Sequence, residues 1–440
     1  MTDPQSKLLD KIRQQFDSSP YPRIPLDKSP KDSPNELYIH NLVTSFYLRD
    51  QKVIDTKDKY ILDAGCGSGY KSLILAEANP DAKIVGVDIS AESIKLAEQR
   101  LKYHGFDNAE FHVLSIEDLA QLKYQFDYIN CDEMLYLFPE PAEALRAMKT
   151  VLKPEGIIRS NLHSIEQRSS VYRAQKMFKM MGLMDENPED LEIEVVVETM
   201  QALKDNVLLK FQTWNSNYTS KENKEDILMN HLFQGDKGYT VSDMFKFLEL
   251  AGLEFISMVN WREWDFRDLF KESDNLPIFW SMSLPDISIE ERLKIYELLN
   301  PVHRLLDFWC GHPQASSTFI PFSEYSDTDW QKVNVYLHPQ LQTLKFKEDL
   351  LACVTECRSF NISQHLSINN QFISIDSAIA MCLLPLLDAP QNMISLIDFW
   401  MHLRPVNPAT LKFTDLESSF QLIKKTLLFL EALDYLMLEI

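Results

Sequence analysis

The sequence predicts an α/β fold built on a parallel sheet, followed after residue 330 by a separate, mainly helical unit. Three observations carry this prediction. An apolar strand runs into a glycine-rich turn and then a helix at residues 60–78. Short apolar segments then alternate with helical patterns as far as residue 161, which is typical of a sheet covered by helices. Beyond residue 330 helical patterns predominate.

The glycine-rich turn is the most informative stretch. Gly65, Gly67 and Gly69 follow Asp63 at every second position, and a helix begins at Lys71. Glycine permits positive φ and lets a ligand approach the backbone closely. The N-terminus of a helix attracts phosphate and other polar groups. The sequence therefore predicts a ligand-cradling loop here, and a glycine-rich turn without a ligand is the alternative.

A second strand at 83–88 ends in an acid. Asp88 lies about 20 residues beyond Gly69, where a carboxylate can bind both hydroxyls of a ribose. The glycine spacing is G-x-G-x-G, and Tyr70 stands where a dinucleotide fingerprint has its third glycine. This combination resembles motif I and the second-strand acid of class I S-adenosylmethionine-dependent methyltransferases. The resemblance implies a Rossmann-like, seven-stranded sheet and S-adenosylmethionine as cofactor.

The remaining elements follow in the order that such a sheet needs. Ser90 is predicted to be the N-cap of a helix at 91–104. Gly252 is predicted to end a helix that starts after Thr240. Further strands are predicted at 111–115, 126–131, 157–161, 255–259 and 303–310, and a helix at 140–152. Because open α/β sheets bind ligands at the carboxyl ends of their strands, residues 131–136 and 161–163 should face the methyl group.

The resemblance also implies which residues contact the cofactor. The family often has an acid after the third strand, and Ser115 stands at that position here. We therefore expect adenine to contact the Glu117 side chain and the backbone of Ile116. Tyr21 belongs to a proline-rich, extended segment at 19–26 that is expected to lie across the cofactor cleft. The full set of expected cofactor contacts is Asp63, Gly65, Gly67, Gly69, Asp88, Ile89, Ile116, Glu117, Cys131 and Tyr21.

A more specific resemblance extends over most of the chain. The strand 126–131, Tyr136 beyond it, Asn161 after the fifth strand and the Arg-containing helix that follows look like bacterial protein-lysine methyltransferases with a C-terminal regulatory domain. The segment 375–388 resembles their regulatory module. Two features depart from that pattern: Phe138 replaces a second aromatic residue of the family, and Leu162-His163-Ser164 replaces its residues after Asn161.

This resemblance implies methylation of a lysine side chain by in-line transfer. The candidate catalytic residues are Tyr136, His163 and Asn161. A lysine nucleophile must be neutral, which costs on the order of 4 kcal/mol at neutral pH because its pKa is about 10.4. An aromatic wall lowers that pKa by desolvation, and Tyr136, Tyr21 and Tyr38 are available for it. His163 could accept the proton or be a structural loop histidine.

The chain is expected to divide into four parts. Residues 1–55 form an N-terminal helical or lid segment, and residues 56–165 the cofactor-binding core. Residues 166–315 contain a helical insertion and the remaining sheet strands. Residues 330–440 form a winged-helix-like C-terminal domain with helices near 345–357, 374–388, 391–402 and 416–434, which serves regulation or protein contact.

Composition excludes several classes of partner. Lys and Arg number 44 against 65 Asp and Glu, so the net charge of −21 disfavours nucleic acid and anionic membranes. No apolar run approaches the length of a membrane helix, and the N-terminus lacks a signal-peptide core, so a cytoplasmic location is expected. The six cysteines have no metal-ligand spacing, so no metal is expected. A protein substrate bearing lysine is compatible with an acidic surface.

Two alternatives remain open from the sequence. A small-molecule N- or O-methyltransferase would share the same cofactor motifs, and a closed pocket under residues 166–234, in place of a surface groove, would favour it. A non-catalytic cofactor-binding scaffold is the other. A nucleic-acid methyltransferase is disfavoured because no Asn/Asp-Pro-Pro-Tyr and no Pro-Cys sequence is present.

Overall fold

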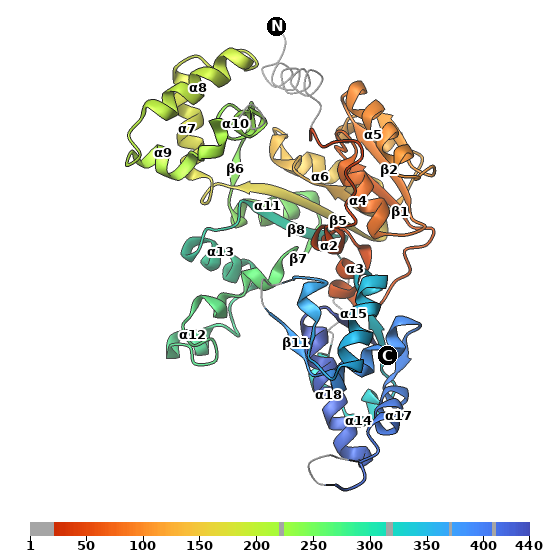
Figure 1. Cartoon of the computed structure of the whole chain (residues 1–440). Coiled ribbons are helices and arrows are strands. Elements are labelled where there is room, and N and C mark those ends of the chain that lie inside the picture. The colour runs from red at the N-terminus through yellow and green to blue at the C-terminus, as the bar shows by residue number, and fades with distance from the viewer. Residues whose placement is uncertain (1–21, 220–223, 314–319, 369–371, 407–410) are drawn as a thin grey trace. The chain divides into compact units, whose positions relative to one another are not determined.

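The computed structural model describes residues 22–219, 224–313, 320–368, 372–406 and 411–440 (Figure 1). The chain forms two units. The first contains the described parts of Met1–Asp27, Tyr60–Ser72 and Ile84–Pro313. The second contains those of Lys28–Lys59, Leu73–Lys83 and Gln314–Ile440. Both units are therefore assembled from segments that lie far apart in the sequence.

Within the described residues, the first unit is built on an eight-stranded sheet. Seven strands follow the order β3-β2-β1-β4-β5-β8-β7, and the short β6 pairs with β5. The strands are β1 (Tyr60–Ala64), β2 (Lys83–Asp88), β3 (Glu110–Val113), β4 (Phe126–Cys131), β5 (Leu152–Ser164), β6 (Gly238–Tyr239), β7 (Glu254–Met258) and β8 (Leu305–Gly311). β8 runs antiparallel to both of its neighbours, β5 and β7, whereas the pairs β1–β4, β2–β3, β4–β5 and β5–β6 are parallel. The predicted α/β class with a Rossmann-like, mainly parallel sheet is confirmed, and β6 is an addition that the sequence did not indicate.

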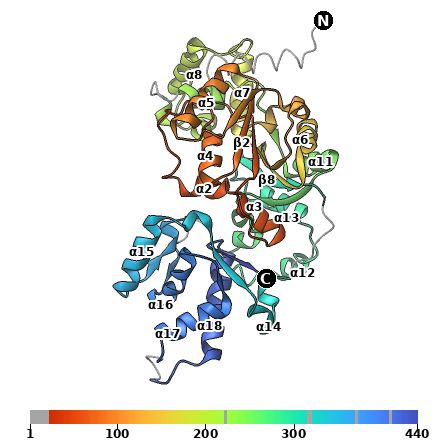
Figure 2. The same cartoon turned by 90° about the vertical axis from the view of Figure 1, so that its right-hand side faces the viewer.

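Helices cover both faces of this sheet (Figure 2). On one face α5 (Ala91–Tyr103) packs Ile94 and Ala97 against Cys66 and Phe111. On the other, α6 (Pro141–Thr150) and α11 (Val241–Ala251) share the main core with the apolar side chains of the strands. β4 is buried along its whole length because both of its faces are covered. Parallel strands of this kind need an almost continuous apolar sequence, which is why they could be found.

Two helix ends show how local sequence fixes these helices. Ser90 accepts a hydrogen bond from the Ser93 N–H at the start of α5, as predicted. Thr240 and Asp243 form a reciprocal capping box at the start of α11. Gly252 ends α11 with a φ of +64°, a conformation that a side chain would strain.

The segment between β5 and β6 forms a small helical layer with its own core. Its helices are α7 (Ser169–Met180), α8 (Asp190–Ala202), α9 (Leu208–Thr213) and α10 (Lys224–His231). Ala174, Phe178, Val196 and Met200 are fully buried in this core. Between β7 and β8 the chain adds α12 (Ile278–Ser283) and α13 (Ile289–Leu299), the latter started by a Ser288–Glu291 capping box.

The second unit combines helices with a small sheet that, in the described chain, has the antiparallel order β12-β9-β13. Its elements are α2 (Pro34–Ile39), α3 (Leu42–Asp50), α14 (Asp327–Trp330), β9 (Asn334–Leu337), α15 (Leu344–Thr355), β10 (Phe360–Asn361), β11 (Ser374–Ile375), α16 (Ser377–Ala380), β12 (Gln391–Asn392), α17 (Met393–Leu403), α18 (Leu416–Ala432) and β13 (Leu436–Glu439). The helix expected at 374–388 is broken into α16 and two 3-10 turns, and Pro385 lacks the N–H that a longer helix would need. The winged-helix-like assignment stays a prediction.

Buried polar contacts join the N-terminal helices to the end of the chain within this unit. The Tyr38 hydroxyl donates to Asp434, and Tyr47 donates to Glu431 at 3.0 Å. His338 lies fully buried, 3.0 Å from the Thr44 hydroxyl, and this burial lowers the pKa of its imidazole to about 4. Tyr38, which the sequence offered as part of an aromatic wall, is thus a core residue of the second unit.

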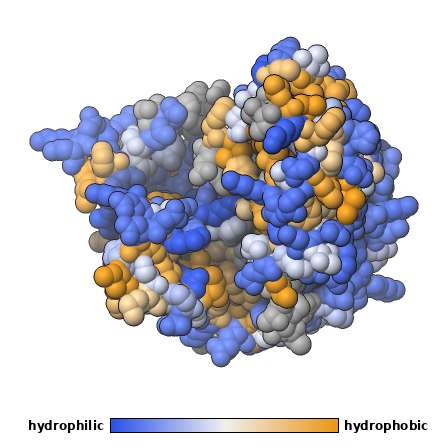
Figure 3. All heavy atoms as spheres, turned by 90° about the horizontal axis from the view of Figure 1, so that it is seen from below, coloured by the Kyte–Doolittle hydropathy of each residue, from blue (hydrophilic) through white to orange (hydrophobic). Residues whose placement is uncertain are grey.

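On the face drawn in Figure 3 hydrophilic residues prevail, with hydrophobic residues in patches between them. Across the described residues, no helix combines the length and the apolar character that crossing a membrane requires.

Candidate functional site

The glycine loop joins β1 to α4 (Tyr70–Ala78) and is tied to the neighbouring strand. The backbone N–H groups of Gly65 and Cys66 both donate to the Val87 carbonyl, at 2.8 and 3.0 Å. The φ angles are +82° at Gly65, +49° at Gly67 and +81° at Gly69. Because all three are left-handed, the loop needs glycine at each alternate position.

Close packing adds a second reason for glycine at Gly69. A Cβ placed there would lie 2.6 Å from the Cα of Ala97 on α5. The loop therefore lies directly against that helix, whereas Gly65 and Gly67 stay partly accessible. At Gly65 a Cβ would lie 2.5 Å from Met134 Cγ, so that side chain covers part of the backbone cradle at the end of β1.

Asp88 lies at the tip of β2, beside this cradle. Its Oδ2 accepts the Gly67 N–H at 3.0 Å, and its Oδ1 accepts the Ser90 N–H at 2.8 Å. A carboxylate can accept several hydrogen bonds, so these two contacts are compatible with binding of the two hydroxyls of a ribose. Ile89, next in the chain, is partly buried.

Asp63 is buried beneath the loop. Its carboxylate accepts hydrogen bonds from Ser72 Oγ at 2.6 Å and from Asn130 Nδ2 at 2.9 Å. Burial raises the pKa of this carboxyl to about 6 in spite of those bonds. An amine brought to Asp63 would have to share oxygens that the protein already uses.

The two expected adenine contacts begin the 3-10 turn Ile116–Gln121 that follows β3. Ser115 caps this turn, and its hydroxyl donates to Glu117 Oε2 at 3.1 Å. The Glu117 side chain is exposed, and the Ile116 side chain is buried. Glu117 is therefore accessible to a ligand, whereas Ile116 could contribute only its backbone.

Cys131 ends β4 and is fully buried. Its carbonyl accepts a hydrogen bond from Ser160 Oγ at 3.2 Å, and burial raises the pKa of its thiol to about 12. A thiol in this state is not a nucleophile at neutral pH. Cys131 is therefore a packed residue whose backbone carbonyl is fixed by Ser160, and its expected contact with the cofactor stays a prediction.

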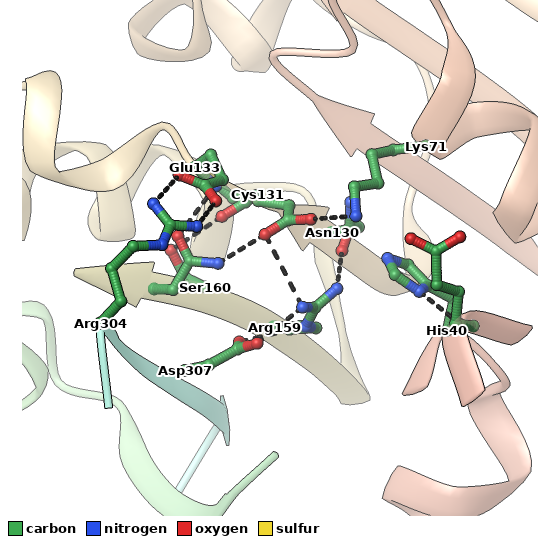
Figure 4. A network of polar contacts seen from close by, with 12 residues as sticks. His40, Lys71, Asn130, Cys131, Glu133, Arg159, Ser160, Arg304 and Asp307 are labelled. Carbon is green, nitrogen blue, oxygen red and sulfur yellow. Dashed lines mark hydrogen bonds and ion pairs between the residues drawn. The ribbon is translucent and has the colours of Figure 1, made fainter. Parts of the chain in front are cut away.

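Two acids follow Cys131 and centre a polar network (Figure 4). Asp132 lies 3.1 Å from Lys71 Nζ and accepts from Asn161 Nδ2 at 2.5 Å. Asn161 Oδ1 in turn accepts the backbone N–H of Glu133 at 2.8 Å. Asn161 thus fixes both acids, and Glu133 is held there with a φ of +60°, a strained value for a residue with a side chain.

The Glu133 carboxylate is the accessible end of this network. Its side chain is 27% exposed and forms an ion pair with Arg304, one contact of which measures 3.1 Å. Tyr136 also donates its hydroxyl to Glu133, at 3.1 Å. Burial would raise the pKa of this carboxyl, but hydrogen bonds with His163 and Arg304 outweigh it and hold the pKa at about 2. Glu133 is therefore a carboxylate at any physiological pH.

His163 lies behind Glu133 in a buried layer. Its ring stacks on Tyr136 with centroids 3.7 Å apart, and its Nδ1 lies 2.6 Å from Asp236. Asp236 also accepts from Arg168 at 2.8 Å; these partners outweigh burial and lower the pKa of its carboxyl to about 2. His163 Nε2 lies 3.6 Å from Glu133 and 3.1 Å from Arg304 Nη1.

The three residues predicted as catalytic are thus brought together, but all are buried. Tyr136 is 1% exposed, His163 2% and Asn161 0%. Glu133 is the member of the group that a substrate can reach. Sequence reasoning placed Glu133 in the range 131–136 expected to face the methyl group but did not single it out. It missed Arg304 and Asp236, which no local pattern marks because strand pairing brings them in from distant segments.

The N-terminal segment is fastened to the cofactor side. Ser68 Oγ donates to the Pro22 carbonyl at 2.7 Å. The buried Arg100 of α5 donates to the carbonyls of Ile24, Pro25 and Ser68 at 2.7 to 3.0 Å. Proline-rich backbone offers many carbonyls and few N–H groups, which suits a guanidinium partner. Tyr21 itself lies outside the described residues.

The described residues contain no group of three or more His, Cys, Asp or Glu side chains placed to hold a metal ion. The features that are present are a glycine cradle, a ribose-type acid and an acidic cluster at the ends of β4 and β5. They fit an adenosyl cofactor with a neighbouring acceptor position.

Comparison with known proteins agrees with this fit. Residues 55–235 match the family model of a methyltransferase domain. An uncharacterized protein of Synechococcus sp. is 26% identical over 317 residues, 71% of this chain and 73% of that protein. A ubiquinone biosynthesis O-methyltransferase of Neisseria meningitidis is 30% identical over 105 residues, 24% of this chain and 44% of that enzyme, so the match spans less than half of it.

A solved structure shares the fold. PKMT2 from Rickettsia typhi aligns with 92% of this chain and 75% of its own, with a TM-score of 0.59 and 16% identity. The same protein has been solved in complex with AdoHcy, at a TM-score of 0.58 and 18% identity. Taken with the glycine cradle and Asp88, the match over residues 55–235 supports a methyltransferase domain with S-adenosylmethionine as its cofactor.

Proposed function

We propose that this chain methylates lysine side chains of a protein substrate, with Glu133 receiving the lysine amine. Glu133 carries the proposal: it is a permanent carboxylate, partly exposed, at the end of β4 where the acceptor should lie. A carboxylate attracts an ammonium group, and the surrounding acidic surface favours a lysine-bearing partner. Bound S-adenosylmethionine would supply an electrophilic methyl group.

The residues around Glu133 support an orienting role. Asn161 fixes its backbone, Tyr136 donates to its carboxylate, and Arg304 pairs with it. His163 lies between the two acids of this group, with Nδ1 2.6 Å from Asp236 and Nε2 3.6 Å from Glu133. Asp63, Asp88 and Glu117, together with the glycine loop, Ile89, Ile116 and Cys131, form the cofactor side of the proposal.

The likeness to PKMT2 supports the same proposal at the level of the fold. It extends over 92% of the chain and so includes most of both units. The chain has a second unit beyond the methyltransferase domain. Such a unit would offer a contact surface to a protein substrate. We also propose that the second unit recruits the substrate or regulates the enzyme. The four-part division of the chain and a cytoplasmic location are part of the same proposal.

A small-molecule O-methyltransferase is the second candidate. Two ubiquinone biosynthesis O-methyltransferases, each 30% identical to this chain, favour it. These matches cover 24% and 29% of the chain.

Isotope transfer separates the two candidates. The full chain is incubated with methyl-labelled S-adenosylmethionine and a lysate of the source cells, and label is followed into protein and into small extractable molecules. The proposal expects acid-stable label in protein that hydrolyses to N-methylated lysine. Label confined to an extractable molecule would overturn it in favour of the second candidate.

Variants then test the role of Glu133. Glu133→Gln should lower transfer to lysine by about 100-fold through loss of a charge-assisted contact, and Tyr136→Phe by about fivefold through loss of one hydrogen bond. Both should leave the affinity for S-adenosylmethionine within about twofold of the wild type. The exposed Glu98 and Tyr103 provide matched controls as Glu98→Gln and Tyr103→Phe. Equal loss of transfer and of cofactor affinity would remove Glu133 from the acceptor position.

A further inference from the structure

A second cavity lies in the first unit, and none of the residues that line it belongs to the site above. Its volume is about 650 Å³. It is bounded by the edge strand β7, by the two 3-10 turns Trp261–Trp264 and Phe266–Leu269, and by α12 and α13. Small-molecule sites usually measure roughly 300–1,000 Å³, so this cavity has room for a complete ligand.

The walls are mainly apolar and aromatic. Trp261, Trp264 and Phe266 line one side, and Leu284 and Leu293 line the α12–α13 side. Phe266 also packs against the ring of Trp280, with centroids 4.8 Å apart, which holds this wall in place. Such a lining selects an apolar body and leaves orientation to the few polar groups present.

Those polar groups are mostly donors. The Nε1–H of Trp261 is buried and, among the described residues, has no acceptor. Arg292 donates through Nε and one Nη to the carbonyls of Ile287 and Leu284, which leaves its other Nη free to donate. Arg267 forms an ion pair with Asp265 at 2.8 Å.

The charge of the lining is opposite to that of the protein. Two guanidinium groups, on Arg267 and Arg292, face one carboxylate, on Asp265, so the cavity carries one excess positive charge. The chain as a whole carries −21. A buried donor without an acceptor costs free energy unless a ligand meets it, and an anionic head group would meet both Trp261 and the free Nη of Arg292.

We propose that this cavity is a binding site for a small apolar carboxylate, with its hydrocarbon or aromatic body between the tryptophans and its carboxylate toward Arg292 and Trp261. The site is separate from the cofactor cradle and from Glu133. It takes a ligand of opposite charge to the lysine-type acceptor.

Calorimetric titration of the full chain with octanoate, and with octanol as the neutral match, tests the site. Octanoate should bind in a one-to-one ratio, and octanol about tenfold more weakly because the charged hydrogen bond is lost. Trp261→Phe keeps an aromatic ring but removes the donor, and should weaken octanoate about fivefold. Trp214→Phe lies outside the lining, in the helical layer between β5 and β6, and should bind octanoate as the wild type does.

Further variants distinguish a loss of octanoate binding from a loss of folding. Arg292→Met should weaken octanoate at least tenfold, but it also removes contacts to two carbonyls of the α12–α13 connection. Ser281→Trp adds volume to the cavity from α12, retains Arg292 and should abolish octanoate binding, whereas Arg173→Met on α7 should leave the binding unchanged. Absence of octanoate binding to the wild type, or equal binding by the wild type and by Ser281→Trp, would overturn the proposal.

Discussion

The backbone N–H of Gly67 donates a hydrogen bond to Asp88 Oδ2 over 3.0 Å. This contact joins the glycine loop after β1 to the acid at the tip of β2, so the two halves of the cofactor motif form one rigid piece. The second oxygen of Asp88 is fixed by the N–H of Ser90, the N-cap of α5. A carboxylate oriented by two backbone donors is already placed for a ribose before any ligand arrives.

Packing of the loop against α5 predicts an unequal effect of two glycine substitutions. Gly69→Ala combines a positive φ with a clash 2.6 Å from the Ala97 Cα, whereas Gly105→Ala has a φ of +85° and open space around it. Gly105→Ala should cost about 1–2 kcal/mol of unfolding free energy from backbone strain, and Gly69→Ala about 1–3 kcal/mol more from overpacking. Urea unfolding of both variants measures this, and equal costs would contradict the packing described here.

Arg100 should control the N-terminal segment. Arg100→Lys keeps the charge but cannot donate to the carbonyls of Ile24, Pro25 and Ser68 together. Trypsin should then cleave after Arg23 about tenfold faster, and S-adenosylmethionine should bind several-fold more weakly because the segment is anchored to the cofactor loop. Mass spectrometry of timed digests follows the cleavage, with Glu98→Gln on the same helix as control. Unchanged cleavage would mean that other contacts hold the segment.

The buried Asp63 predicts a pH dependence of stability. Its pKa is raised by burial from 3.8 to about 6, so between these values the folded state binds more protons than the unfolded state. Stability from this group therefore falls as pH rises, by about 1 kcal/mol between pH 5 and pH 7. Asp63→Asn should lose this component, and the difference between the two pH profiles of urea unfolding isolates it. Parallel profiles for the variant and the wild type would show that Asp63 is ionised throughout.

The sheet and the cofactor loop could be predicted because local sequence specifies them. Buried parallel strands need apolar runs, and the loop needs glycine where φ is positive. Ser90 and Gly252 are single residues that mark the ends of helices. The expected cofactor residues, apart from Tyr21, fall at the ends of β1 to β4 or in the turns that follow them. Their roles at the cofactor stay predictions.

The acceptor side could be predicted only in part, because long-range pairing builds it. Tyr136, Asn161 and His163 were found from their positions after β4 and in β5. Arg304 reaches them because β8 pairs with β5, and Asp236 because β6 pairs with the end of β5. The sequence interpretation also took these residues as direct contacts, whereas the burial of Tyr136 and His163 leaves Glu133 between them and solvent.

Titration calorimetry with S-adenosylmethionine tests the central claim, that the glycine loop and Asp88 form the cofactor site. Asp88→Ala should weaken binding about 100-fold through loss of two charge-assisted hydrogen bonds, and Asp88→Asn, which retains one acceptor oxygen for the Gly67 N–H, about tenfold. Asp118→Ala, at an exposed acid in the turn after β3, should bind as the wild type does. Wild-type affinity in a folded Asp88→Ala protein would contradict the account.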